Sequence, residues 1–395
     1  MLEHDGIPKN FVRITSNGFY LPELDGLRFL AIASVFLFHV YAYLTAHQNI
    51  FSGTAAEYDL LQRFLRNGGA GVPLFFVISG FTISLPFASH SICRTSPPDL
   101  TYYFCRRLTR IEAPYALCMV IFASVLALTG TYPMVEVLHR MGAGLLYLNS
   151  VLYGGSMSII NEVVWSLEVE VQFYVLAPVL CMSFALGRML RRGLFIGAML
   201  VAALLQCCSS TWVFSPLTVV GNLQYFAAGL LIADLYLTRG APGTSRQKLI
   251  IDGVGCAVIP LIFYFGWKTP TSRFLTPFLM VLLCYGVLRG VVLRRLFSFS
   301  WIVLVGSMCY SLYLIHLGVI KVLSPVIESM LVGRSPVTGF LLAVLFFGGA
   351  VVLAGAGYYR AIERPCMNTE WPARLAQQIR ATIKNVAHGR KVGGR

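Results

Sequence analysis

The chemically informative residues of this sequence are ionisable side chains inside long apolar runs. Arg28 and His39 lie in the first run, Glu170 in the fourth and His316 in the ninth. A charge is costly in lipid, so such residues usually mark a pathway or a site. An imidazole can act as a general base near neutral pH, and a neighbouring carboxylate orients the ring and raises its basicity. We therefore expect His39 and Glu170 to form a pair.

Both residues of the first run fall on one line along a helix. Eleven residues at about 100° each give three turns plus about 20°, with a rise of about 16 Å. This spacing puts Arg28 at the inner edge of the membrane and His39 near its middle, at the depth that the same count gives for Glu170 and His316. Taken alone, this pair is explained equally well by a structural role, in which Arg28 is a snorkelling anchor and His39 packs between helices. Glu168 is predicted to face the water at the outer surface.

The composition indicates what kind of element holds these residues. Of the 395 residues, 57% are apolar and only 12% are charged, which is too little polar material to cover a soluble fold. Soluble globular, disordered and nucleic-acid-binding proteins are excluded together. About 20 apolar residues cross a bilayer, so ten crossings account for the apolar excess. No Gly-rich phosphate loop or zinc spacing occurs, and the ten cysteines are scattered, so we expect no metal site.

The hydropathy pattern predicts an all-α membrane protein, a polytopic bundle of about ten transmembrane helices. The apolar runs lie near residues 27–46, 71–88, 113–130, 163–186, 193–210, 218–237, 249–267, 274–292, 301–320 and 337–359. We expect three parts: a cytoplasmic N-terminal segment (1–24), a transmembrane domain (25–360) and a basic cytoplasmic tail (361–395). The first run has no cleavable signal before it, so we expect it to remain in the mature protein.

The basic residues set the predicted orientation. With both termini in the cytoplasm, 23 of the 31 Lys and Arg residues fall in inner segments and only seven in outer loops. The net charge of +14 therefore describes topology rather than an acidic partner. We expect a multi-pass protein of the inner cell membrane.

Several motifs occur in the order found in a known family. They are Asp25-Gly26-Leu27-Arg28 with His39, Phe75-Phe76-Val77-Ile78-Ser79-Gly80-Phe81, Arg107-Leu108-Thr109-Arg110 with Pro114-Tyr115, Trp165-Ser166-Leu167 with Glu170, Phe173 and Tyr174, and Tyr310-Ser311 with Tyr313-Leu314-Ile315-His316 and Ile362-Glu363-Arg364-Pro365. From about residue 20 to 366 the chain resembles acyltransferase family 3, a family of integral membrane acyltransferases. Each motif alone is weak, but the ordered set is specific.

The resemblance implies an O-acetyltransferase that moves an acyl group, commonly acetyl, from cytoplasmic acyl-coenzyme A to a hydroxyl group, often of a carbohydrate at the outer face. On their own, Arg107 and Arg110 fit the general excess of positive charge on the cytoplasmic side. The resemblance implies instead that, with Arg28, they bind the donor's phosphates. A pantetheine arm on the order of 20 Å long would reach from there to His39. We expect His39 to act as general base or to take the acyl group first, with Glu170 orienting or charging it.

The motifs supply further candidate site residues, namely Asp25, Ser79, Trp165, Tyr310, His316 and Glu363. For Asp25, an N-cap of the first helix is an equal alternative. Aromatic residues near the span ends suit interface belts better than a sugar-stacking surface. These residues are Tyr41, Tyr43, Trp165, Trp212, Trp267 and Trp301. We expect the outer segment 131–162 and the first outer loop to help to choose the acceptor.

Two further alternatives stay open on the sequence alone. A proton-coupled transporter of a small metabolite or glycan precursor would also place His and Glu at mid-membrane, although the sequence shows no internal repeat. Some family members carry an added extracytoplasmic domain, which we expect this chain to lack. We therefore expect transfer either to finish within the membrane or to pass to a separate extracytoplasmic partner.

Overall fold

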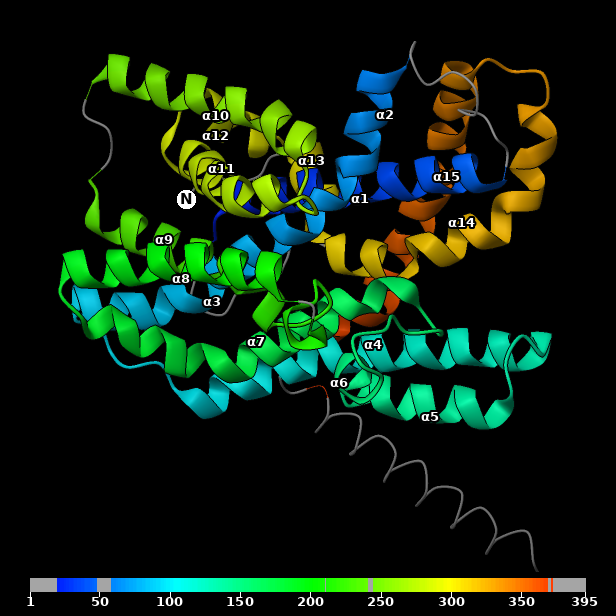
Figure 1. Ribbon diagram of the computed structural model, residues 1–395, viewed down its shortest axis with the longest axis horizontal. Helices are drawn as coiled ribbons and strands as arrows, with labels where there is room; N and C mark the ends of the chain where they lie inside the picture. Colours follow the sequence, from blue (N-terminus) through cyan, green and yellow to red (C-terminus); the bar gives the residue numbers. More distant parts are fainter. Residues whose placement is uncertain (1–19, 48–57, 210, 241–243, 369–370, 372–395) are drawn as a thin grey trace, which may run out of the picture.

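The computed structural model of this protein describes residues 20–47, 58–209, 211–240, 244–368 and 371, and Figure 1 shows its helices. Across these ranges the chain is helical and contains no strand. Ten helices or helical runs in the described ranges are long and apolar enough to cross a membrane. The predicted all-α bundle of about ten transmembrane helices is therefore confirmed. Most of the N-terminal segment and of the basic tail lies outside the described residues, and the orientation of the termini stays a prediction.

Long helices form the bundle, and short ones connect or extend them. The long helices are α1 (Pro22–His47), α3 (Gly71–Cys93), α4 (Leu100–Thr129), α5 (Met134–Leu145), α7 (Trp165–Cys181), α8 (Arg188–Cys208), α9 (Leu223–Thr238), α10 (Ser245–Phe265), α11 (Pro270–Arg289), α14 (Cys309–Leu331) and α15 (Pro336–Tyr358). The short helices are α2 (Asp59–Arg66), η2 (Asn67–Ala70), α6 (Asn149–Leu152), η3 (Glu162–Val164), η4 (Met182–Ala185), η5 (Trp212–Phe214), η6 (Val220–Asn222), α12 (Val292–Phe297), α13 (Ser300–Ser307), η7 (Tyr359–Glu363) and α16 (Arg364–Cys366).

The ninth predicted span differs from the structure. The apolar run 301–320 predicts one helix, but the chain forms α13 and α14, which meet at Met308. The helix that is long enough to cross the membrane is α14, which continues to Leu331. Hydropathy does not reveal this break because the residues on both sides are apolar. Helix α13 instead packs against α1, where a Cβ on Gly306 would overlap the Asp25 carbonyl oxygen.

Close helix contacts in the bundle depend on small residues. Helices α3 and α9 pack along their lengths, and α1 contacts α3, α13, α14 and α15, so the helix that carries His39 is central (Figure 1). A Cβ on Gly80 would lie 2.6 Å from the Phe226 carbonyl oxygen, and one on Gly229 would lie 2.5 Å from the Phe81 nitrogen. Small residues permit this approach of two backbones in a membrane, where packing rather than hydrophobic exclusion holds helices together.

Two buried aspartates join helices of the bundle. Asp234 on α9 is fully buried, and its two oxygens accept hydrogen bonds of 2.5 Å from the Nε atoms of Arg191 and Arg192 on α8. Asp252 on α10 accepts three backbone hydrogen bonds at the start of α12, the last from Leu293 at 3.0 Å. Removing one partner of such a group would leave an uncompensated charge, so these contacts fix how the helices join.

The chain continues to pack on the bundle after α15. The π-helix η7 extends α15, and its last residue, Glu363, is fully buried. Farther on, Trp371 donates a hydrogen bond from Nε1 to the Thr109 carbonyl of α4 at 3.0 Å. These contacts join the first part of the predicted tail to the helical domain.

Candidate active site

Two histidines from distant parts of the chain meet inside the bundle. His39 lies two-thirds of the way along α1, and His316 lies in the third turn of α14. Nδ1 of His39 is 3.2 Å from Nε2 of His316, and the ring centroids are 4.9 Å apart. His316 is fully buried, whereas His39 is half-buried. The sequence places the two residues at one depth, and the structure brings them into contact.

Backbone carbonyls define which nitrogen of each ring carries the proton. Nδ1 of His316 lies 2.8 Å from the Tyr313 carbonyl, so that nitrogen donates and Nε2 is left with its lone pair. Nδ1 of His39 lies 2.9 Å from the Val35 carbonyl and must also carry a proton, which it shares with Nε2 of His316. His39 Nε2 therefore keeps a lone pair, and no hydrogen bond within the described part of the chain engages it. This nitrogen is positioned to act as a base.

The expected pairing of His39 with Glu170 is wrong. Oε1 of Glu170 accepts hydrogen bonds from Ser79 Oγ on α3 and from Tyr174 OH, the latter at 2.6 Å. Each side chain has other hydrogen-bond partners. Residues of α3 and α7 bind the carboxylate of Glu170, and the carbonyl of Val35 and the ring of His316 bind His39. Ser79 and Glu170, both predicted site residues, are instead joined to each other.

Two of the predicted donor-binding arginines lie around the Glu170 group. The guanidinium of Arg107 stacks on the rings of Tyr174 and Tyr103, 4.9 and 5.4 Å from their centroids. Arg110, one turn later on α4, lies 3.6 Å from Glu363, which also accepts a hydrogen bond of 2.6 Å from Ser311 Oγ. The predicted site residues Arg110 and Glu363 are thus an ion pair that joins α4 to η7.

The motif residues of the first helix form a separate group. Arg28 donates from Nη1 to Oδ1 of Asp25 at 2.5 Å, and Tyr20 donates to Oδ2 at 2.8 Å. Helix α1 begins at Pro22, so Asp25 lies within its first turn and is not the N-cap. Helix α1 is continuous from Arg28 to His39, as the predicted rise between them requires.

Tyr310 and Trp165 serve the packing around the site. Tyr310 donates to the Ile111 carbonyl of α4 at 2.9 Å. Trp165 is buried and stacks on Trp267 with 6.1 Å between the ring centroids, so neither residue belongs to an interface belt. Next to Trp165, Ser166 lies 2.8 Å from Tyr313 OH, which donates to the Val163 carbonyl. This contact fixes α7 against the turn of α14 that carries His316.

Glu168 does not face outer water. It is buried, and Oε1 accepts hydrogen bonds from the backbone and side chain of Ser150, at 2.9 and 2.6 Å. The segment 131–162 folds back along α4 through α5 and α6 (Figure 1), and its Tyr147 donates to Glu112 at 2.7 Å. Burial, reinforced by the Glu112 carboxylate, raises the pKa of Tyr147, so the phenol remains a donor.

Charged residues near His39 were not identified from the sequence. Glu162, Lys321 and Lys268 lie close enough to His39 to interact with it electrostatically, and the first two form an ion pair of 2.8 Å. Lys268 also lies 5.9 Å from the ring of Phe38, the neighbour of His39. Glu162 and Lys268 lie in two different connections and Lys321 lies in α14, so no local pattern in the sequence could have grouped them. In the described residues no group of three His, Cys, Asp or Glu side chains forms a metal site.

In the described residues, ten helices or helical runs are long and apolar enough to cross a membrane, and the histidine pair lies inside this bundle, which defines a multi-pass membrane protein. A family model described as an acyltransferase domain matches residues 21–359. The chain therefore belongs to acyltransferase family 3, and it is a membrane acyltransferase rather than a transporter.

Curated relatives agree with this assignment. The chain is 26% identical over 336 residues to BcsY of Komagataeibacter xylinus, provisionally named a membrane-bound transacylase, with 80% of this chain and 75% of BcsY covered. It is 24% identical over 375 residues to the O-acetyltransferase OatA of Staphylococcus aureus, with 88% of this chain covered. The chain spans only 57% of the length of OatA. No solved structure shows a significant match to the chain.

Proposed function

We propose that the protein moves an acetyl group from cytoplasmic acetyl-coenzyme A to a hydroxyl group of a carbohydrate or glycoconjugate at the outer face of the inner cell membrane. The observation that carries this proposal is the free Nε2 of His39, whose lone pair is fixed by the contacts of Nδ1 with Val35 and His316. The name of OatA supports acetyl transfer to oxygen. The excess of basic residues in the predicted inner segments supports the orientation.

The proposed chemistry uses this nitrogen as a general base. His39 Nε2 takes the proton of the acceptor hydroxyl while the hydroxyl oxygen attacks the thioester carbonyl. The carbon–sulfur bond breaks, and the imidazolium returns the proton to the thiolate of coenzyme A. An acyl-imidazole formed first on the same nitrogen would lead to the same products. In either route His316 accepts the Nδ1 proton of His39 in a hydrogen bond and stabilises the charged ring.

The arginines of α1 and α4 are the proposed contacts for the donor's phosphates. Arg107 and Arg110 are half-buried and one turn apart, and two tyrosine rings hold the guanidinium of Arg107. Arg28 is held at 14% exposure by Asp25 on the same helix as His39. A cation fixed in advance loses less entropy when it binds a phosphate.

The acceptor is proposed to enter from the other end of the bundle. His39 lies nearer the end of α1 than its beginning, and Lys268, Glu162 and Lys321 lie around it on that side. These charged side chains suit a hydrated, hydroxyl-rich acceptor better than lipid.

Sided vesicles test this proposal. Purified protein is reconstituted with labelled acetyl-coenzyme A on one side of the membrane and a mixture of neutral and acidic oligosaccharides on the other. We expect label bound covalently to an oligosaccharide with wild-type protein and with His47→Ala, a control on the exposed end of α1. We expect almost none with His39→Ala. Normal labelling by a folded His39→Ala protein, or labelling only when donor and acceptor share one side, would contradict the proposal.

A further inference from the structure

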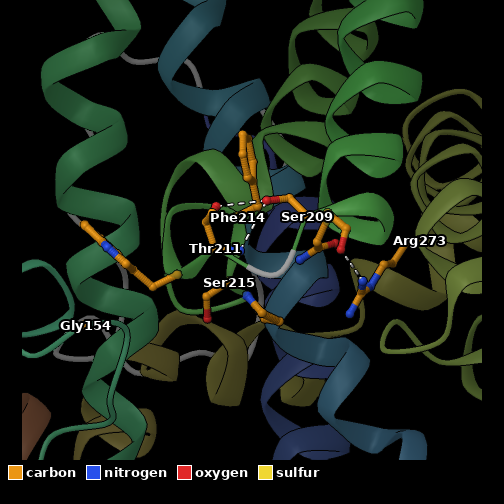
Figure 2. Close-up of a pocket in the computed structure, with 9 residues that line it drawn as sticks. Gly154, Ser209, Thr211, Phe214, Ser215 and Arg273 are labelled. Carbon is orange, nitrogen blue, oxygen red and sulfur yellow. Dashed lines mark hydrogen bonds between the residues drawn. The ribbon is translucent and has the colours of Figure 1, made fainter.

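A pocket of about 470 Å³ lies at the end of α8, along η5 and at the start of α11 (Figure 2), and neither His39 nor His316 lines it. Its wall includes Gln206, Ser209, Thr211, Trp212, Ser215 and Arg273. The volume falls in the range of pockets that bind small ligands. The function assigned above uses none of these residues.

The pocket wall contains a cation. Among the described residues that line the pocket, Arg273 is the only charged one, and none is acidic. Its Nη1 donates to the Gln206 carbonyl at 2.6 Å, as Figure 2 shows by a dashed line. Its Nε is buried and has no hydrogen-bond partner in the described residues. A guanidinium in this state favours an anionic group of a ligand.

A buried polar atom next to the pocket is also unsatisfied. Gln224 and Tyr225 are almost fully buried, and Gln224 donates from Nε2 to Gln206 Oε1 at 3.1 Å. Gln224 Oε1 then has no partner in the part of the chain that the structure describes, and the neighbouring Gln224 side chain interacts with Tyr225 OH. Tyr225 is near enough to Arg273 to interact with it electrostatically. Unpaired polar groups in a membrane domain are costly, and a polar guest or the water it brings would satisfy them.

The pocket wall also includes an aromatic side chain and hydroxyl groups. Trp212 is 42% exposed. Ser209 and Thr211 lie 2.9 Å apart through their hydroxyl oxygens, and each hydroxyl group can still form a further hydrogen bond (Figure 2). An indole face with hydroxyl groups and a guanidinium around it matches a sugar ring that carries an acidic substituent, because the ring stacks while its polar edge is hydrogen-bonded.

The pocket opens at the same end of the bundle as the polar surroundings of His39. The spans alternate in direction, so the end of α8 and the start of α11 share a face with the end of α1. Two stretches of chain lead from the pocket toward His39, from Arg273 back to Lys268 and from Gly154 on to Glu162. The longer stretch has eight residues and spans at most about 30 Å, which a short oligosaccharide can bridge.

From this geometry we infer that the pocket binds an acidic sugar unit of the acceptor, some distance from the hydroxyl group that is acetylated. Arg273 holds the acidic group, Trp212 stacks on the ring, and the chain of the glycan runs on toward His39. The inference rests on the proposed function for the identity of the acceptor, but the binding site itself can be tested without the reaction.

Binding is measured by calorimetry on full-length protein in detergent, without donor. The probes are trigalacturonate, neutral maltotriose and inorganic phosphate. Wild-type protein is expected to bind trigalacturonate about tenfold or more tightly than maltotriose, because a hydrogen bond to a charged group is worth at least one factor of ten. Arg273→Gln is expected to lose this preference, and Arg273→Lys to keep part of it. Trp212→Ala is expected to weaken the binding of both sugars. Trp301 is an exposed tryptophan on α13, and Trp301→Ala is expected to change the binding of neither.

The outcomes separate the pocket from the proposed function. An unchanged preference in Arg273→Gln, sugar binding that is unaffected by Trp212→Ala, or no binding of trigalacturonate by wild-type protein would overturn the inference. Phosphate that binds as tightly as trigalacturonate would show that the pocket recognises only the negative charge, and it would overturn the sugar assignment. A failure of acetyl transfer with the binding preference intact would count against the proposed function alone.

Discussion

Replacing His316 by alanine is expected to slow acetyl transfer without abolishing it. His316 supplies the acceptor for the Nδ1 proton of His39 at 3.2 Å and contacts no other ionisable side chain through a hydrogen bond in the described residues. Val35 still accepts the same proton at 2.9 Å, so His39 keeps its tautomer and its free Nε2 in the variant.

The size of the effect follows from the charge that develops on His39. When Nε2 takes a proton, the bond from Nδ1 to His316 becomes a hydrogen bond from a charged group, worth about 1.5–3 kcal/mol. Each 1.36 kcal/mol is a factor of ten in rate, so kcat should fall about tenfold to a hundredfold. Loss of a general base costs about 10²- to 10⁴-fold, which is the expected effect of His39→Ala.

The assay compares initial rates of transfer from labelled acetyl-coenzyme A by wild-type, His316→Ala and His316→Gln proteins. Glutamine offers a carbonyl oxygen in place of the imidazole nitrogen, so His316→Gln should recover part of kcat, whereas a role in packing alone would not depend on the acceptor. Donor affinity and the thermal unfolding midpoint serve as controls, because the His316 side chain is fully buried and its removal leaves a cavity.

Two results would refute this reasoning. A folded His316→Ala protein with wild-type kcat would show that the Val35 carbonyl alone is a sufficient acceptor for the Nδ1 proton of His39 and that His316 has no part in catalysis. A protein as inactive as His39→Ala, with no recovery in His316→Gln, would show that His316 itself handles the reacting groups.

Three further predictions concern the donor site and the fold. Arg107→Lys should raise the KM for acetyl-coenzyme A with little change in kcat, since lysine lacks the planar fork that stacks on tyrosine. The control Arg106→Lys should leave this KM unchanged, and equal KM values in the two variants would contradict the donor assignment. Asp234→Asn should lower the free energy of unfolding by about 3–5 kcal/mol because two arginines lose their counter-ion, and an unchanged unfolding midpoint would speak against it. Gly80→Ala should lower the free energy of unfolding by about 1–3 kcal/mol, because the new Cβ overlaps α9. The control is Gly349→Ala, whose Cβ would meet no atom within 4 Å, and equal unfolding midpoints for the two variants would disprove the close contact.

The sequence predicts the helical architecture well because lipid imposes one strong requirement. A crossing helix must be apolar over about 20 residues, so the runs alone locate ten spans. The error at the ninth span arises where one apolar run contains two helices that meet at Met308. Composition does not determine where a continuous apolar run changes direction.

The sequence indicated candidate residues for the site better than it indicated which of them contact one another. Helical periodicity places His39 and His316 at one depth, but it gives no information about the rotation of each helix about its axis. Glu170 therefore contacts Ser79 instead of His39. Asp25 lies in the first turn of α1 and is not its N-cap, and only the structure shows that its partner is Arg28.

The most direct test of the central assignment is the rate of acetyl transfer by His39→Ala at saturating donor. With the affinity for acetyl-coenzyme A and the unfolding midpoint unchanged, we expect kcat to fall by about 10²- to 10⁴-fold, as for the loss of a general base. A folded, donor-binding His39→Ala protein that transfers acetyl groups at the wild-type rate would contradict the assignment of His39 Nε2 as the base.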